Sequence, residues 1–365
     1  MQYVPDILFV ELTRACEYSC SHCRANSLTF PEKTDLRIDE LKEIVDEVTE
    51  INNKILVVIT GGDPLLSPYF SSFMIYLRQR RVRFSLSPPA SPILSFEYLQ
   101  YLSENGLASM SMSLDGTPAT HDLIRNKKGS FRDTLDILNL SREVGIKTQI
   151  NSTLMKKNMK DFPFILKTIL ESDIKTWEIF FLINVGRGIA ERSVSASEFE
   201  DFLKFLYGVE SNFNLTIRTV EAPEYRRVKE QMKETNSISG GAYFSYLREK
   251  TMELTGVDIS VKVKDLNNGK RFKTLFVSSS GDVMVSGLFP LKLGSIRTKR
   301  LNDILNDSEI LNHLSEKERY VGKCSSCEYF DTCGGSRARA FAETGDFLAS
   351  DPICLYVPQK ISARN

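Results

Sequence analysis

Short apolar runs alternate with amphipathic stretches over the first half of the chain. Runs rich in β-branched and aromatic residues predict strands, and stretches with apolar residues every three or four positions predict helices. The strands expected from this pattern are Ile7–Leu12, Ile55–Thr60, Val82–Ser87, Ala108–Leu114, Ile146–Leu154 and Trp177–Ile183. The helices expected between them are Ile38–Ile51, Tyr69–Arg81, Phe96–Asn105, Phe131–Val144 and Phe162–Glu171. Strands that alternate with helices form βαβ units and a parallel sheet.

The repeats stop short of the number that closes a barrel. Six strands can be counted before the pattern changes after Gly188, whereas a closed barrel has eight strand–helix units. The sequence therefore predicts an α/β fold built on a partial (β/α)6 barrel of the TIM type. In such barrels the functional site lies at the carboxyl ends of the strands, and we expect it there.

The second half of the chain has a different pattern. Residues 195–252 are predicted to be helical, with one short strand at Leu215–Val220. Phe272–Ser278 and Asp282–Ser286 are joined by a turn that ends in glycine, which is typical of a β-hairpin. We expect three parts: the barrel over residues 1–190, a helical connecting region over 191–268, and a smaller, loop-rich α+β domain with cysteines over 269–365. No low-complexity linker separates them, so the last part should pack directly on the barrel.

Composition and charge exclude several classes of protein. The chain has 365 residues, of which 42% are hydrophobic and 26% charged, and its 47 basic residues balance 47 acidic ones. This balance provides no global field for binding nucleic acid or a membrane surface. Glu11 and Arg14 interrupt the N-terminal apolar stretch, so no signal peptide is expected, and no run approaches the roughly 20 apolar residues of a membrane span. Seven cysteines in two groups suit metal or redox chemistry in a reducing compartment, and we expect the cytoplasm.

The first group of cysteines is a compact triplet on the loop after the first predicted strand. Cys16, Cys20 and Cys23 have the spacing C-x3-C-x2-C, and three thiolates this close in sequence can hold three corners of an iron–sulfur cluster. A cluster normally has four ligands, so three leave one iron open to chemistry. Two alternatives are a structural zinc site closed by His22 and a redox dithiol. The spacing and the position of the loop favour the open cluster.

This motif, with the aromatic His22 before its last cysteine, resembles the signature of the radical S-adenosylmethionine (SAM) enzymes. The resemblance implies a 4Fe–4S cluster on Cys16, Cys20 and Cys23, with the amino and carboxylate groups of SAM on the fourth iron. It also implies an oxidoreductase that cleaves SAM with one electron from an external donor such as flavodoxin or ferredoxin. The 5′-deoxyadenosyl radical formed in this way abstracts hydrogen from the substrate, and the protein positions the cofactors.

The resemblance extends to the loops after other predicted strands. Gly61-Gly62-Asp63-Pro64 follows the second strand and is similar to the Gly-Gly-Glu-Pro motif with which the family holds the amino group of SAM. Two glycines also allow the backbone to approach a ligand closely. An arginine suits the SAM carboxylate because its planar fork can pair with both oxygens. By the same resemblance, the further SAM contacts are His22, Ser113, Asp115, Arg125, Asn151, Leu182 and Ile183.

The second group of cysteines lies near the C-terminal end of the chain. It consists of Cys324, Cys327, Cys333 and Cys354. A set of four cysteines fits either structural zinc or a cluster. Beside a radical SAM core it resembles the SPASM or twitch extension, which carries auxiliary 4Fe–4S clusters. Because Ser286 and Arg337 stand where the full SPASM pattern has cysteines, the resemblance implies one auxiliary cluster that is fully ligated by the four cysteines.

The tail from Cys333 to Cys354 and the segment Glu221–Arg227 resemble the subgroup that contains enzymes of alternative heme and denitrifier heme biosynthesis. This implies a tetrapyrrole substrate, whose side chain is decarboxylated or removed. Since its carboxylates need cations, we expect a cavity between the barrel mouth and the twitch domain, lined by aromatic residues and at least two arginines. The candidate substrate contacts are Arg187, Glu221, Arg226 and Arg337, with Arg227 and Arg339 as further cations.

Two other functions stay open at this point. The same radical chemistry on a ribosomally made peptide would form a crosslink or an oxidised residue, although no leader-binding domain is evident in the fifteen residues before Cys16. A non-catalytic iron–sulfur sensor or electron carrier is the third hypothesis. A carrier has no need of SAM contacts such as Gly61–Pro64 and Arg125, and this disfavours it.

The cysteine assignments predict how iron is divided between two sites. Anaerobically reconstituted protein is expected to bind about eight irons per chain, four at each group. Replacing Cys16, Cys20 and Cys23 together with alanine should remove about half of the iron and abolish SAM cleavage, and replacing Cys324 and Cys327 should remove the other half. Iron analysis and an assay of 5′-deoxyadenosine check these results. Full iron retention in the triple variant, or native zinc at the second group, would contradict the assignment.

Overall fold

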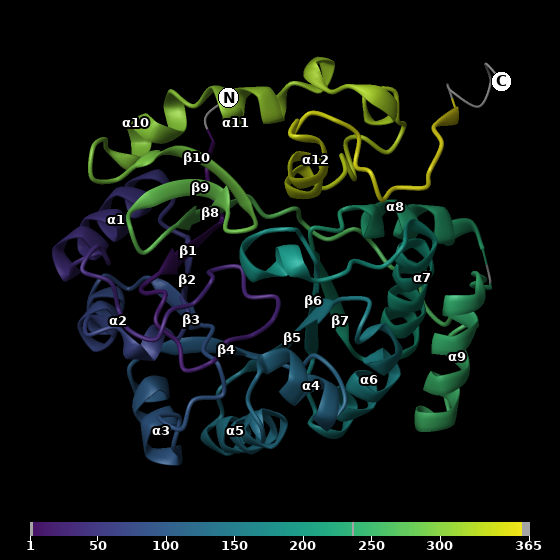
Figure 1. Cartoon of the computed structure of the whole chain (residues 1–365), viewed down its shortest axis with the longest axis horizontal. Coiled ribbons are helices and arrows are strands. Elements are labelled where there is room, and N and C mark those ends of the chain that lie inside the picture. The colour runs from purple at the N-terminus through teal and green to yellow at the C-terminus, as the bar shows by residue number, and fades with distance from the viewer. Residues whose placement is uncertain (1–2, 236, 360–365) are drawn as a thin grey trace.

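The structure, a computed structural model, describes residues 3–235 and 237–359. Within this part of the chain, ten strands form one sheet in the order β10-β9-β8-β1-β2-β3-β4-β5-β6-β7 (Figure 1). The strands are β1 (Ile7–Glu11), β2 (Leu56–Thr60), β3 (Arg83–Leu86), β4 (Leu107–Ser113), β5 (Thr148–Leu154), β6 (Thr176–Phe181), β7 (Thr216–Val220), β8 (Thr274–Val277), β9 (Asp282–Ser286) and β10 (Phe289–Ser295).

The predicted partial barrel is confirmed. The six predicted strands correspond to β1 to β6, and their ends lie within about two residues of the expected positions. Neighbouring strands from β8 through β1 to β7 are parallel. The parallel part curls into a half-barrel that stays open between its two ends, because the sheet order ends at β7 on one side and β10 on the other.

Four strands outside the six repeats extend the same sheet. The strand expected at Leu215–Val220 is β7, which continues the parallel sheet beside β6. The expected hairpin is β8 and β9, but β8 also pairs with β1 in parallel, with Ile7 opposite Thr274. The barrel and the C-terminal segment therefore share one sheet, and the boundaries proposed near residues 190 and 268 stay a prediction. A third antiparallel strand, β10, was not predicted because Pro290 and Gly294 interrupt its apolar pattern.

Helices cover the outer face of the half-barrel and extend beyond it (Figure 1). Helix α4 was not predicted from the sequence, since it is short and mostly polar. Pro118 begins it and the left-handed Asn126 ends it. The helices are α1 (Ile38–Ile51), α2 (Phe70–Gln79), α3 (Phe96–Glu104), α4 (Pro118–Arg125), α5 (Ser130–Val144), α6 (Phe162–Glu171), α7 (Ala196–Asn212), α8 (Glu224–Gln231), α9 (Ala242–Thr255), α10 (Leu301–Asn306), α11 (Glu309–Ser315) and α12 (Arg337–Thr344).

Aromatic side chains join the barrel to the helices of the second half. Phe162 on α6 lies 5.7 Å from the ring of Trp177 on β6 and 4.6 Å from the ring of Phe202 on α7. All three side chains are fully buried. Edge-to-face and stacked aromatic pairs contribute stabilising free energy beyond that from the burial of their apolar surface. Helix α7 therefore packs as part of the barrel's core.

The inner face of the half-barrel is largely polar over β3, β4 and β5, unlike that of a closed TIM barrel, where branched apolar side chains fill the interior. On β4 every second residue faces inward, and these residues are serines. Ser109 forms a hydrogen bond with Ser85 on β3 at 2.7 Å, and Ser111 donates to Ser87 just beyond β3 at 2.9 Å. Small hydrogen-bonded side chains leave the interior hollow, and this hollow becomes part of the cavity described below.

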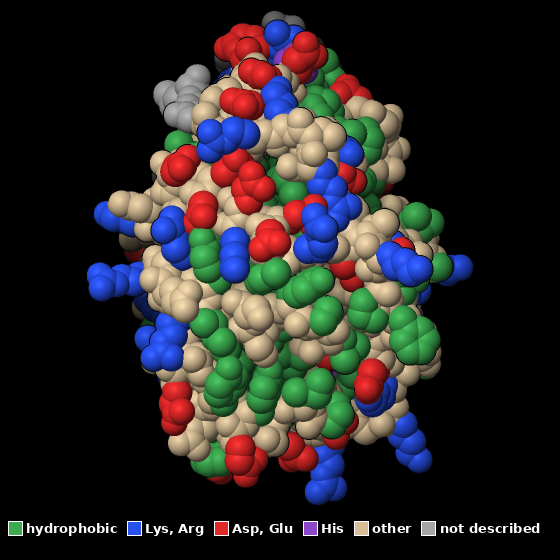
Figure 2. Space-filling model, turned by 90° about the vertical axis from the view of Figure 1, so that its left-hand side faces the viewer, with side chains coloured by type: hydrophobic (Ala, Val, Ile, Leu, Met, Phe, Trp, Pro, Cys, Tyr) green, Lys and Arg blue, Asp and Glu red, His purple; other side chains and the backbone are tan. Residues whose placement is uncertain are grey.

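The C-terminal segment with α10, α11 and α12 lies over the β8–β10 side of the sheet (Figure 1). Ion pairs tie its beginning to α1, between Arg297 and Glu40 at 2.7 Å and between Arg300 and Glu47 at 2.8 Å. On this face of the molecule, basic and acidic side chains are interspersed rather than gathered into one patch (Figure 2). Among the described residues, no helix combines the length and the apolar character needed to cross a bilayer.

A buried hydrogen-bonded chain across three strands gives a stability prediction. Trp177 Nε1 donates to Ser152 Oγ at 2.9 Å, and Ser152 Oγ donates to the carbonyl oxygen of Leu114 at 2.5 Å. Ser152→Ala leaves both groups buried and unpaired, so the free energy of unfolding should fall by about 1–3 kcal/mol. Ser72→Ala, on the exposed face of α2, serves as the control and should change it by less than about 0.5 kcal/mol. Chemical denaturation measures both, and an unchanged midpoint for Ser152→Ala would contradict this account.

Candidate functional site

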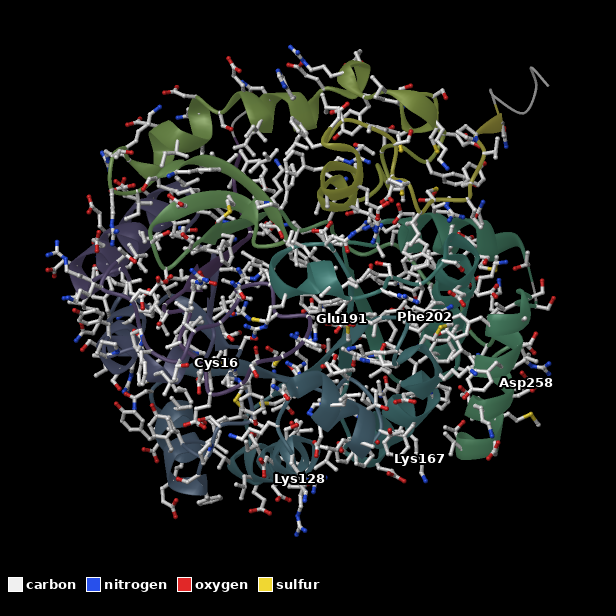
Figure 3. The ribbon with its side chains drawn as sticks, in the orientation of Figure 1. Cys16, Lys128, Lys167, Glu191, Phe202 and Asp258 are labelled. Carbon is white, nitrogen blue, oxygen red and sulfur yellow. The ribbon has the colours of Figure 1, made fainter. Side chains whose placement is uncertain are left out.

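The loop between β1 and α1 carries the first three cysteines to the carboxyl edge of the sheet. Cys16, Cys20 and Cys23 all line one cavity, and all three are free thiols. Cys23 N donates to Cys20 O at 3.2 Å, and Tyr18 N donates to Cys16 Sγ at 3.3 Å. Cys16 lies in the interior of the molecule, whereas Lys128 and Lys167 lie at its edge (Figure 3). The cysteines therefore lie where the sequence predicted them.

The Gly61-Gly62 turn after β2 packs directly against the beginning of this loop. Gly62 N donates to Thr13 O at 2.7 Å. A Cβ atom at Gly61 would lie 2.6 Å from Thr13 O, and one at Gly62 would lie 2.3 Å from Ala15 O. Both distances are impossible for a side chain, so the two loops can meet only through glycine. Gly61 and Gly62 also line the cavity, and their backbone faces the cysteines.

The Asp63 carboxylate is used within its own turn, and its contact with SAM stays a prediction. Its Oδ1 accepts a hydrogen bond from Leu65 N at 3.0 Å and caps a 3-10 turn, η1 (Pro64–Leu66). Neither Asp63 nor Pro64 lines the cavity. Burial raises the pKa of Asp63 to about 6. This carboxylate shapes the turn, and the turn presents the backbone of Gly61 and Gly62 to the cavity.

Arg125 reaches the cysteine loop from the last turn of α4. Its Nη1 donates to Cys20 Sγ at 3.7 Å, and its Nη2 forms an ion pair with Asp115 Oδ2 at 2.5 Å. Arg125 lines the cavity but Asp115 does not. Asp115 is fully buried, and its Oδ1 accepts a hydrogen bond from Thr153 N at 2.8 Å. The sequence predicted a SAM contact for Asp115, whereas the structure uses it to hold Arg125 beside Cys20.

Charge and burial set the protonation of the groups around Cys20. Burial by itself would raise the pKa of Asp115, but Arg125, together with His22 and His121, outweighs it, and the pKa is lowered. Asp115 is therefore ionised at neutral pH. His22 lines the cavity with its Nδ1 buried and without a hydrogen-bond partner among the described residues. Burial lowers the pKa of His22 to about 4, so its ring is neutral.

The remaining predicted SAM contacts lie along the same edge of the sheet. Ser113 ends β4, Asn151 lies on β5, and Leu182 and Ile183 follow β6; all four line the cavity. Gln149 Nε2 donates to Asn151 Oδ1 at 2.9 Å and to Glu178 Oε2 at 3.2 Å. The structure thus gathers these side chains around one space, and their contact with SAM stays a prediction.

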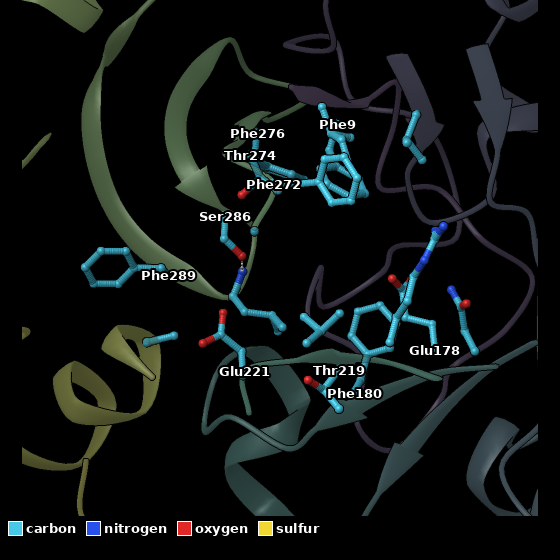
Figure 4. A pocket seen from close by; sticks show the side chains of 18 of the residues that line it. Phe9, Glu178, Phe180, Thr219, Glu221, Phe272, Thr274, Phe276, Ser286 and Phe289 are labelled. Atoms are coloured by element: carbon cyan, nitrogen blue, oxygen red, sulfur yellow. Dashed lines mark hydrogen bonds between the residues drawn. The ribbon is translucent and has the colours of Figure 1, made fainter. Parts of the chain in front are cut away.

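The cavity has a volume of about 1530 Å³ and runs from the cysteine loop through the half-barrel to the C-terminal segment. This volume is larger than the roughly 300–1,000 Å³ of a pocket for one drug-sized ligand, so the cavity has room for two ligands. Aromatic side chains from β1, β6, β8 and β10 and from the segment before β8 line it (Figure 4). They include Phe9, Phe180, Phe272, Phe276 and Phe289.

Arg187 is a correction to the predicted substrate contacts. It lies on the 3-10 turn η3 (Gly186–Ala190) and does not line the cavity. Its Nε donates to Cys20 O at 2.8 Å, and its two terminal nitrogens donate to Ser27 O at 3.2 Å and Ser27 Oγ at 2.9 Å. Three of its nitrogens donate hydrogen bonds to the cysteine loop, so the guanidinium is not free for a substrate carboxylate.

The other predicted substrate contacts divide into two sets. Glu221, Arg226 and Arg337 line the cavity. Arg227 instead pairs with Glu200, and Arg339 pairs with Asp351 at 2.9 Å and donates to Glu221 O at 2.6 Å. Both of these arginines are buried. The first ion pair joins α8 to α7, and the second joins α12 to the segment that contains Asp351. The two arginines have no access to a substrate.

Two cavity residues were missed by sequence reasoning. Arg271 and Phe272 lie in the segment that leads into β8, and both line the cavity. The sequence assigned Phe272 to the hairpin and gave Arg271 no role. An arginine next to an aromatic residue before a strand is a weak signal, because many surface loops contain such a pair. Only the pairing of β8 with β1 brings them to the cavity.

The second group of cysteines is assembled around Gly335. Gly335 N donates to Cys333 Sγ at 3.4 Å, and a Cβ atom at Gly335 would lie 3.5 Å from Cys324 Sγ and 3.0 Å from Asp351 Cβ. Cys354 N donates in turn to Asp351 O at 3.3 Å. With φ at +69°, this position favours glycine. The loop from Cys324 to Cys333 and the segment that ends at Cys354 thus both pack against Gly335, which lines the cavity, whereas the four cysteines do not.

Glu224 is a buried acid beside this second group. Neither of its carboxyl oxygens has a hydrogen-bond partner among the described residues. Burial, and then the charge of Asp351, raise the pKa of Glu224 to about 8. An acid that is protonated at neutral pH needs no counter-ion, which makes this position tolerable in the interior.

The donor sets fit iron–sulfur clusters in kind and number, three thiols in one group and four in the other. Burial raises the pKa of Cys16 to about 12 and also raises the pKa of Cys20. Thiolates in such a place need positive charge, which a bound iron centre supplies. Among residues 3–235 and 237–359, no three His, Cys, Asp or Glu side chains are drawn together as ligands of one metal ion would be.

Comparisons with known proteins agree with this geometry. Residues 10–169 match the radical SAM superfamily, and residues 270–328 match an iron–sulfur cluster-binding domain, SPASM. An AdoMet-dependent heme synthase of Methanosarcina barkeri is 31% identical over 99% of this chain and 99% of its own length. An AdoMet-dependent heme synthase of Nitratidesulfovibrio vulgaris is 30% identical over 96% of this chain and 92% of its own length.

The fold is also found among solved structures. SuiB of Streptococcus suis, in a crystal structure bound to S-adenosylmethionine, covers 96% of this chain with a TM-score of 0.68 and 15% identity, over 77% of that protein. At this identity the likeness concerns the fold. Together with the family matches and the full-length relatives, the cysteine loop and its surroundings lead to one conclusion: the chain is a radical SAM enzyme that carries a C-terminal SPASM domain.

Proposed function

We propose that the substrate of this enzyme is a carboxylated tetrapyrrole. The enzyme decarboxylates or removes one of the side chains of this macrocycle. The observation that carries the proposal is the cavity itself, which connects the cysteine loop with arginines and aromatic faces near the SPASM domain. A planar macrocycle with carboxylates at its rim needs both kinds of surface. The similarity to AdoMet-dependent heme synthases over nearly the whole chain supports the same substrate class.

The cofactors proposed are SAM, one 4Fe–4S cluster on Cys16, Cys20 and Cys23, and one auxiliary 4Fe–4S cluster on the second group of cysteines. When bound, the first cluster and SAM supply a 5′-deoxyadenosyl radical that abstracts hydrogen from the substrate. The electron comes from an external donor of the flavodoxin or ferredoxin type. Seven free thiols in one chain suit a reducing compartment, and we propose the cytoplasm.

The chain's own residues would position SAM and protect the radical. Gly61 and Gly62 line the cavity, and because neither carries a side chain, their backbone can approach SAM closely. Ser113, Asn151 and the backbone after β6 surround the remaining polar parts of SAM. Phenylalanines on the opposite wall exclude water, so a reactive intermediate is kept from solvent.

Arg125 is proposed to balance charge at the first cluster and not only to bind the SAM carboxylate. It lies between Cys20 and Asp115 and lines the cavity. Because Asp115 already takes one end of its guanidinium, the arginine is held rigid, and its remaining donors point to the cavity. A preorganised cation of this kind costs no reorganisation when an anionic ligand binds.

Arg187 supports the cysteine loop, and its replacement gives a prediction. Arg187→Met removes three hydrogen bonds to Cys20 and Ser27. Residues that support metal ligands typically change metal affinity by about 10- to 100-fold, so iron should be lost to a chelator at least several-fold faster than from the parent. Arg192→Met, an exposed change just beyond η3, is the matched control. Equal rates of iron loss in the two variants would contradict the role of Arg187.

The proposed substrate class is tested directly with the reconstituted enzyme. Under anaerobic conditions, with dithionite and SAM, iron-coproporphyrin III should lose carbon dioxide from a side chain while 5′-deoxyadenosine accumulates, and mass spectrometry follows the porphyrin. Arg125→Ala should retain the iron but bind SAM about ten- to a hundredfold more weakly, as expected for a lost charged hydrogen bond.

The same assay can contradict the proposed substrate class. If no carboxylated tetrapyrrole binds or is changed, while 5′-deoxyadenosine still forms from SAM, the tetrapyrrole proposal fails. The alternative of a ribosomally made peptide substrate would then be tested with candidate precursor peptides. If no 5′-deoxyadenosine forms in any reconstituted sample, the fault lies in the cluster or the reductant, and iron analysis distinguishes the two.

A further inference from the structure

Two guanidinium groups line the same cavity, and neither forms an ion pair with a carboxylate of the described residues. Arg226 lies in the first turn of α8, and Arg271 lies in the segment before β8. Both line the cavity. Among the ion pairs and hydrogen bonds of the described residues, neither side chain has a partner. A cation in the first turn is also opposed by the helix dipole, so the position of Arg226 does not serve the helix.

The two arginines come from opposite ends of the parallel part of the sheet, and Asn268 ties their segments together. Arg226 follows β7, whereas Arg271 leads into β8, which lies beyond β1. Asn268 Nδ2 donates to Arg226 O at 3.1 Å and to Glu230 Oε1 at 3.0 Å. This ties residues 268–271 to α8. The pKa of Arg226 is lowered, first by burial and second by the positive charge of Arg271. The second cause agrees with the proximity of the two arginines.

Carboxylates that line this side of the cavity are already engaged elsewhere. Glu210 pairs with Lys229 at 2.7 Å, and Glu221 accepts a hydrogen bond from Ser336 Oγ at 2.5 Å. Two like charges in one wall repel each other in the free protein. The charge of Glu230 partly opposes this repulsion at Arg226, but its Oε1 accepts hydrogen bonds from Asn268 and Thr332, and Glu230 does not line the cavity. An anion that enters the cavity and lies between the two cations would relieve their repulsion.

An aromatic face adjoins the two cations. Phe272 is next to Arg271 in sequence, lines the cavity, and leaves 50% of its surface exposed. A large apolar side chain on a cavity wall gains free energy when an apolar ligand covers it. Figure 4 shows Phe272 on the same wall as Phe9 and Phe276. Lys270 Nζ lies over the Phe272 ring, 5.6 Å from its centroid, and the wall therefore combines a half-exposed aromatic side chain with two guanidiniums that have no ion-pair partner among the described residues.

We infer that Arg226, Arg271 and Phe272 form the subsite for one edge of the macrocycle, with a rim carboxylate between the two guanidiniums and a pyrrole face on Phe272. This rests on the proposed tetrapyrrole function and adds its binding geometry. The subsite lies on elements after β7 and before β8, whereas the SAM side of the cavity comes from β1, β2, β4, β5 and β6 and the loops that follow them. The carboxylates held here are therefore ones that the reaction leaves in place.

Binding titrations with the reconstituted holoenzyme test the subsite. Iron-coproporphyrin III and its tetramethyl ester, which keeps the macrocycle but removes its charge, are titrated anaerobically while the visible absorption is followed. Arg271→Gln and Arg226→Gln should each weaken binding of the acid about tenfold or more and leave binding of the ester unchanged, since a lost charged contact is expected to cost at least that factor. Phe272→Ala should weaken binding of both ligands.

Control variants and iron analysis distinguish loss of the subsite from loss of the cluster and from failure of the proposed function. Arg319→Gln removes an exposed arginine outside the cavity and should leave both affinities unchanged. Iron content is measured for every variant, and if Arg226→Gln loses iron, Arg271→Gln decides the result. Unchanged affinity of Arg271→Gln for the acid overturns the subsite while the proposed function stands. Failure of the parent enzyme to bind either porphyrin overturns the proposed function itself.

Discussion

Close approach of three backbone loops is the constraint on which the rest of the site depends. The cysteine loop is packed between the Gly61-Gly62 turn and Gly186, where a Cβ atom would lie 2.3–2.6 Å from backbone oxygens. No side chain fits at any of these contacts. Arg187 then fixes the loop through Cys20 and Ser27. Three cysteines on a flexible loop would lose conformational entropy each time a cluster bound, and this packing removes that cost during folding.

A buried ion pair fixes the position of a guanidinium in the same region. Asp115 and Arg125 are withdrawn from water beside Cys20, and two charges in such a place are stable only because they pair with each other and with further hydrogen bonds. Asp115 receives one from Thr153 N, so β4, β5 and α4 are all needed to position one guanidinium. The ion pair is thus a means of holding a cation next to a thiolate ligand, and it is weak evidence for stability.

The continuous sheet explains how one cavity can serve SAM and a large substrate. Because β8 pairs with β1, the C-terminal segment is joined to the barrel by backbone hydrogen bonds. The polar interior of the half-barrel remains hollow, and the SPASM side closes over its open end. Arg226, after β7, and Arg271, before β8, line the same cavity although they come from opposite ends of the parallel part of the sheet.

The sequence by itself determined the partial barrel, both groups of cysteines and the edge of the sheet that carries the site. These follow from local periodicity, spacing and the rule that parallel strands end at one edge. It could not determine the direction of single side chains. Asp63 caps its own turn, Asp115 holds Arg125, and Arg187 holds the cysteine loop. The pairing of β8 with β1 brings Arg271 to the cavity. Each of these outcomes depends on contacts between residues far apart in the chain, which no local pattern encodes, so only the tertiary structure decided them.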